Sequence, residues 1–419
     1  MNATGQHSIG AKLESVGLFF GFKEWVFAFF LLAGIFKPDA GTSDSAFDLT
    51  VVLALITAGC VAWTFFRAER QSIGAFLMVL CFFLLFVPTL FWTTWSSYAI
   101  EKASRFYTLT LLATVSPLYL IRTQEGVRRF LSGFIFLCLV VTATALVTML
   151  SQGEDVERLM AFNATTIMTA RAVGAVTLVA ALVWFERSTN RVAIGIALII
   201  LPTVLVATGS KGPLVATPLA LFVTLLLFRG NIRPYLSRFV VICLLSAGFF
   251  YLSLPLIPWT SLFRVGMFVA GQESSSELDR SSLYADSWEG IEKNPKGLGL
   301  GGFASEFGAS GGEAREFSHN IVMEVFLEGG WVTGVYFVFL LWFGLAGIYS
   351  GARYRHSLLD KLTFCLLIFF LANDLVSGEL NDSKVLLAFM GLAIGRRFVV
   401  QHARFVSVQP VVGTLPATR

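Results

Sequence analysis

A histidine and several cations are the side chains of this chain with the clearest chemical capacity. His319 stands where a long polar segment returns to an apolar run, and an imidazole with a pKa of about 6.5 can accept a proton near neutral pH. Arg171 lies inside an apolar run, where a cation costs about 2.5–3.5 kcal/mol in a bilayer. Lys211 lies in a short turn, and Arg280 begins a predicted helix. Cations beside a histidine are typical of a site for a phosphorylated lipid.

Each of these residues also has a structural interpretation. His319 can cap a helix or hold its polar edge at a membrane surface, and Lys211 can be a solvated turn lysine. Arg171 requires an acidic partner, a water-filled cavity or an anionic ligand. A cation at a helix start opposes the helix dipole, which favours pairing or function for Arg280. Four acids further along can simply pair with cations, as most buried acids do: Glu324, Glu328, Asp374 and Glu379.

The composition defines the environment of these residues. Of 419 residues, 56% are hydrophobic and 14% are charged, against about 25% charged in a soluble domain. This excludes a soluble globular enzyme and a disordered chain. The apolar runs are continuous and do not alternate, which disfavours a transmembrane barrel. The net charge of +4 is small and no basic cluster lies in a soluble module, so we expect no nucleic-acid partner.

The predicted fold is an all-α membrane protein of about twelve transmembrane helices. The predicted spans are residues 16–36, 47–66, 74–95, 106–123, 129–151, 164–186, 191–208, 213–229, 236–258, 329–350, 361–378 and 383–400. The chain then divides into a first group of spans (1–258), an outer segment with amphipathic helices (259–328), a last group of spans (329–400) and a tail (401–419).

Loop charge predicts the orientation of these spans. Arginines follow the even-numbered spans, whereas the other loops are mostly acidic or mixed. Because basic loops stay in the cytoplasm, we expect both termini there and residues 259–318 on the outer side. Within that segment the spacing predicts a helix over 280–292 and an amphipathic stretch over 319–327.

No metal site and no cofactor are expected. The cysteines lie singly inside apolar runs, without metal-ligand spacing: Cys60, Cys81, Cys138, Cys243 and Cys365. There is no Asp-x-Asp pair. The glycine-rich stretch 297–302 lacks the strand, helix and Lys-Ser/Thr pair of a phosphate loop, which favours a flexible turn.

Three segments, in the expected order, resemble motifs of bacterial O-antigen ligases and the related polymerases. The turn 207–212 is similar to their T-x-S-R-G element, with Lys211 in the place of Arg. Arg280 with Trp288, followed by 294–299, is similar to their Arg-to-Trp helix and P-x-G-x-G loop. Residues 319–330 are similar to their H-N-x-x-L-x-x-x-x-E-x-G signature, with Met in the place of Leu.

The resemblance implies a C-type glycosyltransferase in a bacterial inner membrane. It implies transfer of a glycan from undecaprenyl pyrophosphate to lipid A-core on the periplasmic face, with inversion and without a metal. His319 would be the catalytic histidine and Arg280 a catalytic pyrophosphate ligand. Membrane lipids would surround the protein. The other expected substrate-binding residues are Arg171, Lys211, Arg264, Ser210, Asn320 and Glu324; Arg171 is included only because of its cost in the membrane.

Three alternatives remain from the sequence. An O-antigen polymerase would use the same donor but a second lipid-linked repeat as its acceptor. A protein O-oligosaccharyltransferase usually carries a longer outer C-terminal domain than this chain shows. A transporter or flippase predicts polar or broken helices near the midplane, whereas the polar features here gather at the outer surface.

Overall fold

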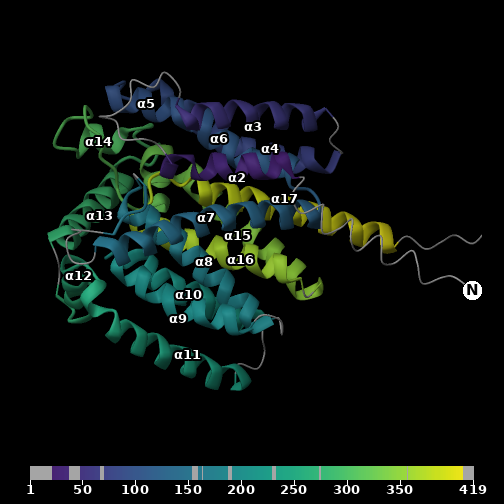
Figure 1. Ribbon diagram of the computed structural model, residues 1–419. Helices are drawn as coiled ribbons and strands as arrows, with labels where there is room; N and C mark the ends of the chain where they lie inside the picture. The colour runs from purple at the N-terminus through teal and green to yellow at the C-terminus, as the bar shows by residue number, and fades with distance from the viewer. Residues whose placement is uncertain are drawn as a thin grey trace, which may run out of the picture.

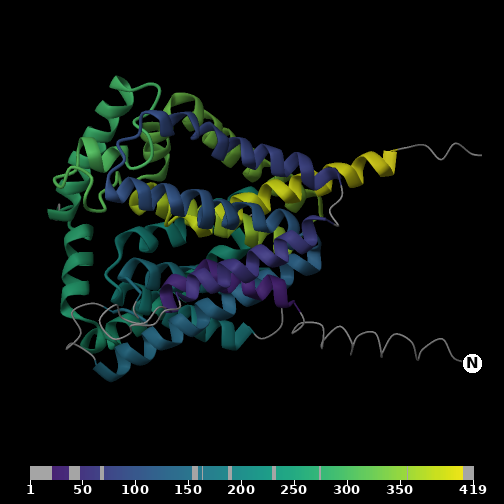
Figure 2. The same cartoon turned by 90° about the horizontal axis from the view of Figure 1, so that it is seen from above.

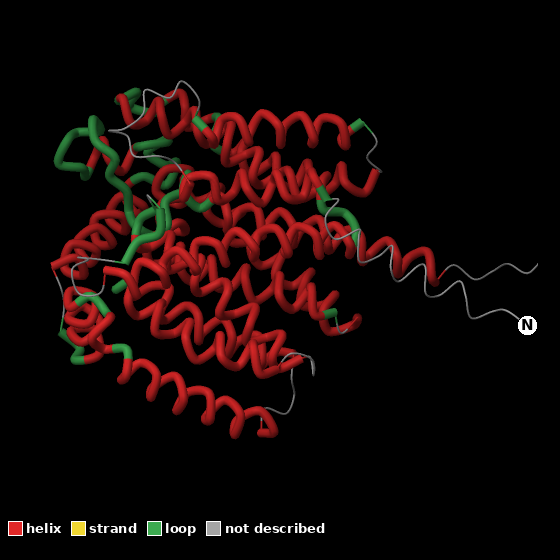
Figure 3. The backbone as a smooth tube through the Cα atoms, viewed as in Figure 1, coloured by secondary structure: helices red, strands yellow, loops and turns green. Residues whose placement is uncertain are grey.

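The computed structural model describes residues 21–36, 48–66, 70–152, 159–162, 164–186, 191–228, 233–272, 275–355 and 357–408. Within these ranges every element of regular secondary structure is a helix, and short loops join the helices (Figure 3). Most helices run roughly along one direction and form a bundle (Figure 1). The predicted all-α class is confirmed.

The helices of the first half are α2 (Phe22–Leu32), α3 (Leu49–Phe65), α4 (Arg70–Leu85), α5 (Ser97–Arg105), α6 (Leu111–Leu120), α7 (Gln124–Gln152), α8 (Thr166–Glu186) and α9 (Arg191–Ala207). Short turns extend three of them: η2 (Ala33–Phe36), η3 (Pro88–Phe91) and η4 (Phe106–Thr110). The last is π-helical and makes α5 continuous with α6.

The second half contains α10 (Lys211–Phe228), α11 (Arg233–Leu252), η6 (Leu254–Leu256), α12 (Trp259–Val269), α13 (Ser275–Lys293), α14 (Gly302–Glu306), α15 (Ile321–Arg355), α16 (Leu358–Ser377) and α17 (Lys384–Val408). Pairs such as α6 with α17, α10 with α16 and α15 with α17 pack against each other, so helices distant in sequence form the core.

The predicted count of twelve membrane-spanning helices is not confirmed, although a helix underlies each predicted span. Among the described residues, five stretches have the length and hydropathy to cross a membrane: Ile73–Phe91, Gln124–Ser151, Thr166–Glu186, Lys211–Phe228 and Ile321–Arg353. Others are too short or too polar: α9 has 17 residues, and α16 contains the buried charged residues Asp360, Lys361 and Asp374. The chain is therefore a helical, multi-pass type of membrane protein.

The predicted outer segment forms one end of the bundle. Helices α12, α13 and α14 gather there beside α5, while the last turns of α17 lie at the opposite end (Figures 1 and 2). The helix predicted over 280–292 is confirmed but begins earlier, at Ser275. Arg280 thus lies in the second turn, and the argument from an opposed helix dipole was wrong for this residue.

The glycine-rich stretch is a packed loop and not the flexible turn expected from its composition. Gly297, Gly299 and Gly301 have positive φ angles of 83°, 89° and 77°. The backbone N–H of Leu298 donates to the carbonyl of Leu327 at 2.8 Å. A Cβ at position 297 would lie 2.5 Å from the carbonyl oxygen of Glu328. Only glycine allows this approach, so the loop is fixed against the start of α15.

Helix α15 contains a break at Gly330, whose φ of 79° is not helical. The break separates a first segment, which begins at Ile321 two residues after His319, from the long apolar segment that follows. The predicted separation of an amphipathic stretch from the next span is confirmed. The first segment can therefore pack on the loop and α13, independently of the membrane-crossing part.

Candidate active site

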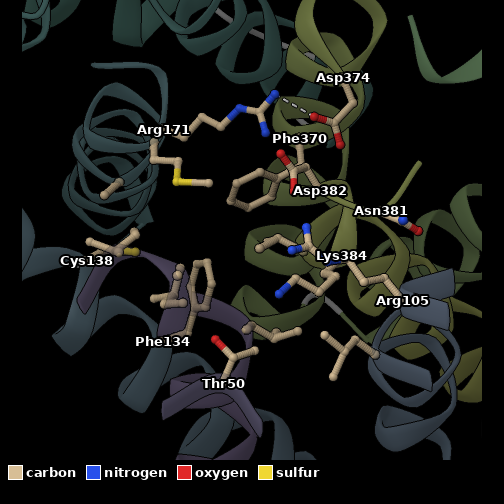
Figure 4. Close-up of a pocket in the computed structure, with 18 of the residues that line it drawn as sticks. Thr50, Arg105, Phe134, Cys138, Arg171, Phe370, Asp374, Asn381, Asp382 and Lys384 are labelled. Atoms are coloured by element: carbon tan, nitrogen blue, oxygen red, sulfur yellow. Dashed lines mark ion pairs between the residues drawn. The ribbon is translucent and has the colours of Figure 1, made fainter. Parts of the chain in front are cut away.

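The C-terminal end of α16 contacts several of the residues singled out by sequence. The Nη2 atom of Arg171 in α8 lies 2.6 Å from the Asp374 carboxylate, and their side chains are 16% and 2% exposed. The same nitrogen donates to the Ser377 hydroxyl at 3.3 Å. Figure 4 shows the ion pair at the edge of a cavity. An acidic partner thus offsets the cost of Arg171, and the expectation that Asp374 pairs with a cation is confirmed.

The turn before α10 packs beside this helix end. Ser210 is buried, and its backbone N–H donates to the Thr208 hydroxyl at 3.3 Å. Lys211 is the first residue of α10, and its Nζ lies 5.5 Å from the ring centre of Phe268 in α12. A Cβ on Gly212 would lie 3.7 Å from the side-chain oxygen of Asn373, the residue before Asp374.

Helix α12 completes this side of the site. The Ser261 hydroxyl donates to the carbonyl of Ala207 at 2.8 Å, which holds α12 against the end of α9. Arg264, a predicted substrate-binding residue, lies one turn further along α12 and is half-buried. The structure therefore brings Ser210, Lys211 and the helix that carries Arg264 together.

Helix α13 approaches from the other side. Its Tyr284 hydroxyl donates to the carbonyl of Val376 at 3.4 Å, near the end of α16. Arg280, one turn earlier, is half-buried. Helix α13 also packs against α15. Three parts of the chain thus contact one short stretch of α16, residues 373–377: helix α8, the turn before α10 and helix α13.

His319 lies in an unusual backbone conformation. Its φ of 56° is in the left-handed region, which non-glycine residues rarely adopt. The imidazole is half-buried and lies 4.3 Å from the Phe317 ring, centre to centre. Such strain persists only when surrounding contacts hold it, and it is concentrated at functional sites.

The surroundings of His319 lower its pKa below the ordinary value of 6.5. Burial is the largest cause, followed by the positive charges of Arg280 and Arg315. Both guanidiniums are therefore within electrostatic reach of the imidazole. A histidine with a lowered pKa is neutral at pH 7 and can accept a proton.

Two other predicted site residues have structural partners. The side-chain oxygen of Asn320 accepts the backbone N–H groups of Val322 at 3.0 Å and Met323 at 3.2 Å, so it caps the start of α15. Glu324 is fully buried, and one of its oxygens accepts the backbone N–H of Leu380 at 2.9 Å. Both side chains therefore support the backbone around the start of α15.

The sequence analysis missed Lys102 of α5. Its Nζ lies 2.5 Å from Glu324 and 2.7 Å from Glu328, and all three side chains are fully buried. Two glutamates four residues apart share one helix face, and buried carboxylates require a cation. The need of buried carboxylates for a cation indicated that a partner exists. Nothing in the sequence showed that this partner is Lys102, more than two hundred residues away.

Arg315 was also missed. Its Nε donates to the Glu379 carboxylate at 2.7 Å, and its guanidinium also binds Asp382. The guanidinium carbon lies 5.6 Å from the ring centre of Phe317. The expectation that Glu379 pairs with a cation is thus confirmed, and its partner stands four residues before His319.

A cavity of about 210 Å³ lies on the far side of the Arg171–Asp374 pair. Side chains of both signs line it: Arg105, Arg171, Lys384, Asp48, Asp374 and Asp382. Figure 4 shows Arg171, Asp374, Asp382, Lys384 and Arg105 around this space, together with Phe134 and Phe370. A larger apolar groove of about 710 Å³ shares Arg105 and Asp48 with it. His319, Arg280 and Lys211 do not line either space, so Arg171 is the predicted residue that faces this cavity.

These features define a helical membrane protein with cations and a strained histidine gathered at one end of its bundle. Residues 195–338 match the family model described as O-Antigen ligase. The match runs from α9 into α15 and includes Lys211, Arg280 and His319. This segment of the chain is similar to that family, and the resemblance drawn from the motifs is confirmed. No curated protein matches the chain.

Proposed function

We propose that this protein is an O-antigen ligase. It transfers the O-antigen polysaccharide from undecaprenyl pyrophosphate to the lipid A-core oligosaccharide. The observation that carries the proposal is the family match across 195–338, which contains the strained, half-buried His319 beside the positive charges of Arg280 and Arg315.

The proposed reaction is a displacement at the anomeric carbon of the donor glycan. His319 accepts the proton of the acceptor hydroxyl while the oxygen of that hydroxyl forms the new glycosidic bond. The bond between the anomeric carbon and the pyrophosphate oxygen breaks, and undecaprenyl pyrophosphate leaves with the electron pair. Attack opposite the leaving group inverts the anomeric centre.

Fixed cations stabilise the charge that develops on the leaving pyrophosphate. We assign this role to Arg280, with Lys211 and Arg264 as further contacts. Arg171 lines the separate cavity beside Asp374. Arginine and lysine can stabilise a transferring phosphate oxygen as a metal does, so the proposed mechanism requires none. Lys211 supplies its charge at a single point and lacks the two-pronged geometry of arginine.

Membrane placement follows from the loop charges. We propose a bacterial inner membrane location, with both termini in the cytoplasm and the site at the periplasmic face. No nucleotide sugar is available on that side, which is consistent with a lipid-linked donor. The open apolar groove supports a lipid partner, since a prenyl or acyl chain is the kind of group that fits an apolar lining.

Deletion of the gene tests the proposal through the lipopolysaccharide on a gel. Loss of a ligase leaves bare core, while long polymer accumulates on the lipid carrier. Loss of a polymerase instead leaves core that bears one repeat, and this result would replace the proposal with the polymerase alternative. An unchanged ladder would contradict both.

A further inference from the structure

The buried ammonium of Lys102 joins three parts of the chain. Its Nζ bonds Glu324 and Glu328 in the first segment of α15 at 2.5 and 2.7 Å. Its backbone carbonyl accepts the side-chain amide of Asn381 at 3.0 Å. Lys102 is therefore attached through its side chain to α15 and through its backbone to the loop between α16 and α17.

Glu324 also bonds directly to the α16–α17 loop. While one oxygen of Glu324 binds Lys102, the other accepts the backbone N–H of Leu380 at 2.9 Å. Leu380 is the neighbour of Asn381. Helix α5, the start of α15 and the α16–α17 loop thus meet around one lysine.

A second residue of α5 reaches the loop one turn earlier. The Tyr98 hydroxyl donates to one oxygen of Glu379 at 2.8 Å, and the other oxygen of Glu379 accepts the Arg315 Nε at 2.7 Å. Arg315 lies over the Phe317 ring, which in turn packs against the imidazole of His319. A continuous chain of contacts therefore leads from α5 to the proposed catalytic histidine.

Burial constrains the relative positions of Lys102, Glu324 and Glu328. One ammonium and two carboxyl groups, all fully buried, meet at this point. A buried carboxylate that loses its cation is strongly disfavoured, and one oxygen of Glu328 already lacks a hydrogen-bond partner. Without Lys102 the two glutamates must take up a proton or shift, and a shift would carry with it the loop that holds Arg315.

We infer that Lys102 is a positioning residue for His319. It fixes the start of α15 and the α16–α17 loop relative to each other, so that Arg315 and Phe317 keep His319 in its strained conformation. It touches neither substrate nor reacting atoms. The expected effect of Lys102 on glycan transfer rests on the proposed function. Its effect on the position of His319 does not.

The test uses the double variant Lys102→Met/Glu328→Gln, because Lys102→Met alone leaves two buried carboxylates and can fail to fold. The double variant keeps one carboxylate, Glu324, which the Leu380 N–H still binds. Glu328→Gln alone is its reference. Lys361→Met is the matched control, since the buried Lys361 forms an ion pair with the half-buried Glu186 at 2.9 Å at the opposite end of α16.

Two measurements are made on the full chain in proteoliposomes. The first is the rate of His319 carbethoxylation by diethyl pyrocarbonate, read by mass spectrometry against His402 in the same molecule. The second is glycan transfer from undecaprenyl pyrophosphate. A misplacement of about 1 Å can cost about 100-fold in rate, so kcat in the double variant is expected to fall about 10- to 100-fold with KM unchanged. Carbethoxylation of His319 is expected to rise.

The outcomes separate this inference from the proposed function. Altered labelling and lost transfer in the double variant, with both unchanged in Glu328→Gln and Lys361→Met, support it. Unchanged His319 labelling in the double variant overturns it, whatever the transfer rate. If the unmodified protein transfers no glycan, the proposed function fails, and labelling alone still decides whether Lys102 positions His319.

Discussion

At the scale of single residues, His319 has the properties that general-base chemistry requires. Its pKa is lowered mainly by burial and secondarily by two neighbouring guanidiniums, so the imidazole is neutral at pH 7. Its φ of 56° and its contact with Phe317 fix the ring. The sequence predicted this residue, because a histidine where a polar segment returns to the membrane is conspicuous.

Replacement of His319 by glutamine should abolish transfer without affecting membrane insertion. Glutamine keeps a hydrogen bond of similar reach but has no basic nitrogen, and loss of a general base typically costs about 10²–10⁴-fold in rate. The rate is measured with purified protein at matched protein levels. Near-normal transfer by His319→Gln would mean that the histidine only positions the acceptor.

Replacement of Arg280 by glutamine should raise the pKa of His319. The guanidinium disfavours the protonated imidazole, so its removal makes protonation easier. The neutral imidazole is the form that reacts with diethyl pyrocarbonate, and the midpoint of labelling against pH should therefore move to higher pH. Arg353→Gln, which changes an exposed arginine of α15, is the control. A midpoint that stays or moves to lower pH contradicts the assignment.

At the scale of elements, hydropathy predicted the helices but not their exact beginnings. Helix α13 begins five residues before the predicted start, since its first turn is polar and has no apolar periodicity. The packing of the glycine-rich stretch 297–302 could not be predicted either, because a flexible turn and a packed loop can have the same glycine-rich sequence. The pairing of Lys102 with Glu324 could not be predicted, since it joins α5 to α15 across most of the chain.

The glycine loop offers a test of packing at this scale. Gly297→Ala places a Cβ 2.5 Å from a backbone oxygen in addition to the strain of a positive φ. We expect a lower midpoint of thermal unfolding, with the backbone strain alone worth about 1–3 kcal/mol. Gly271→Ala is the matched control, because Gly271 also has a positive φ but has nothing within 4 Å of its Cβ position. Equal losses in both variants would contradict a packed loop.

At the scale of the whole molecule, the charged groups divide between the two ends of the bundle. Arg171, Arg280, Arg315 and His319 lie at the end that carries α12, α13 and α14. The ion pair Lys361–Glu186 and the buried pair Arg396–Asp360 lie near the beginning of α16, toward the other end. The sequence predicted this division from loop arginines, whereas its count of twelve membrane-spanning helices is not confirmed.

Cysteine labelling tests the proposed orientation. Ser275→Cys, at the start of α13, should react with a membrane-impermeant thiol reagent in intact cells, whereas Arg404→Cys, near the end of α17, should react only after lysis. Both variants are made in a background without the five natural cysteines. Reaction of Arg404→Cys in intact cells would reverse the orientation and remove the periplasmic site.

The central claim is that His319, in this setting of cations, catalyses transfer from a lipid-linked pyrophosphate. The most direct measurement is glycan transfer in proteoliposomes that contain the purified protein, an undecaprenyl-pyrophosphate-linked O-antigen and lipid A-core, followed as core that acquires polymer. We predict transfer with the unmodified protein and about 10²–10⁴-fold less with His319→Gln. Absence of transfer by the unmodified protein, or equal transfer by the two, would contradict the account.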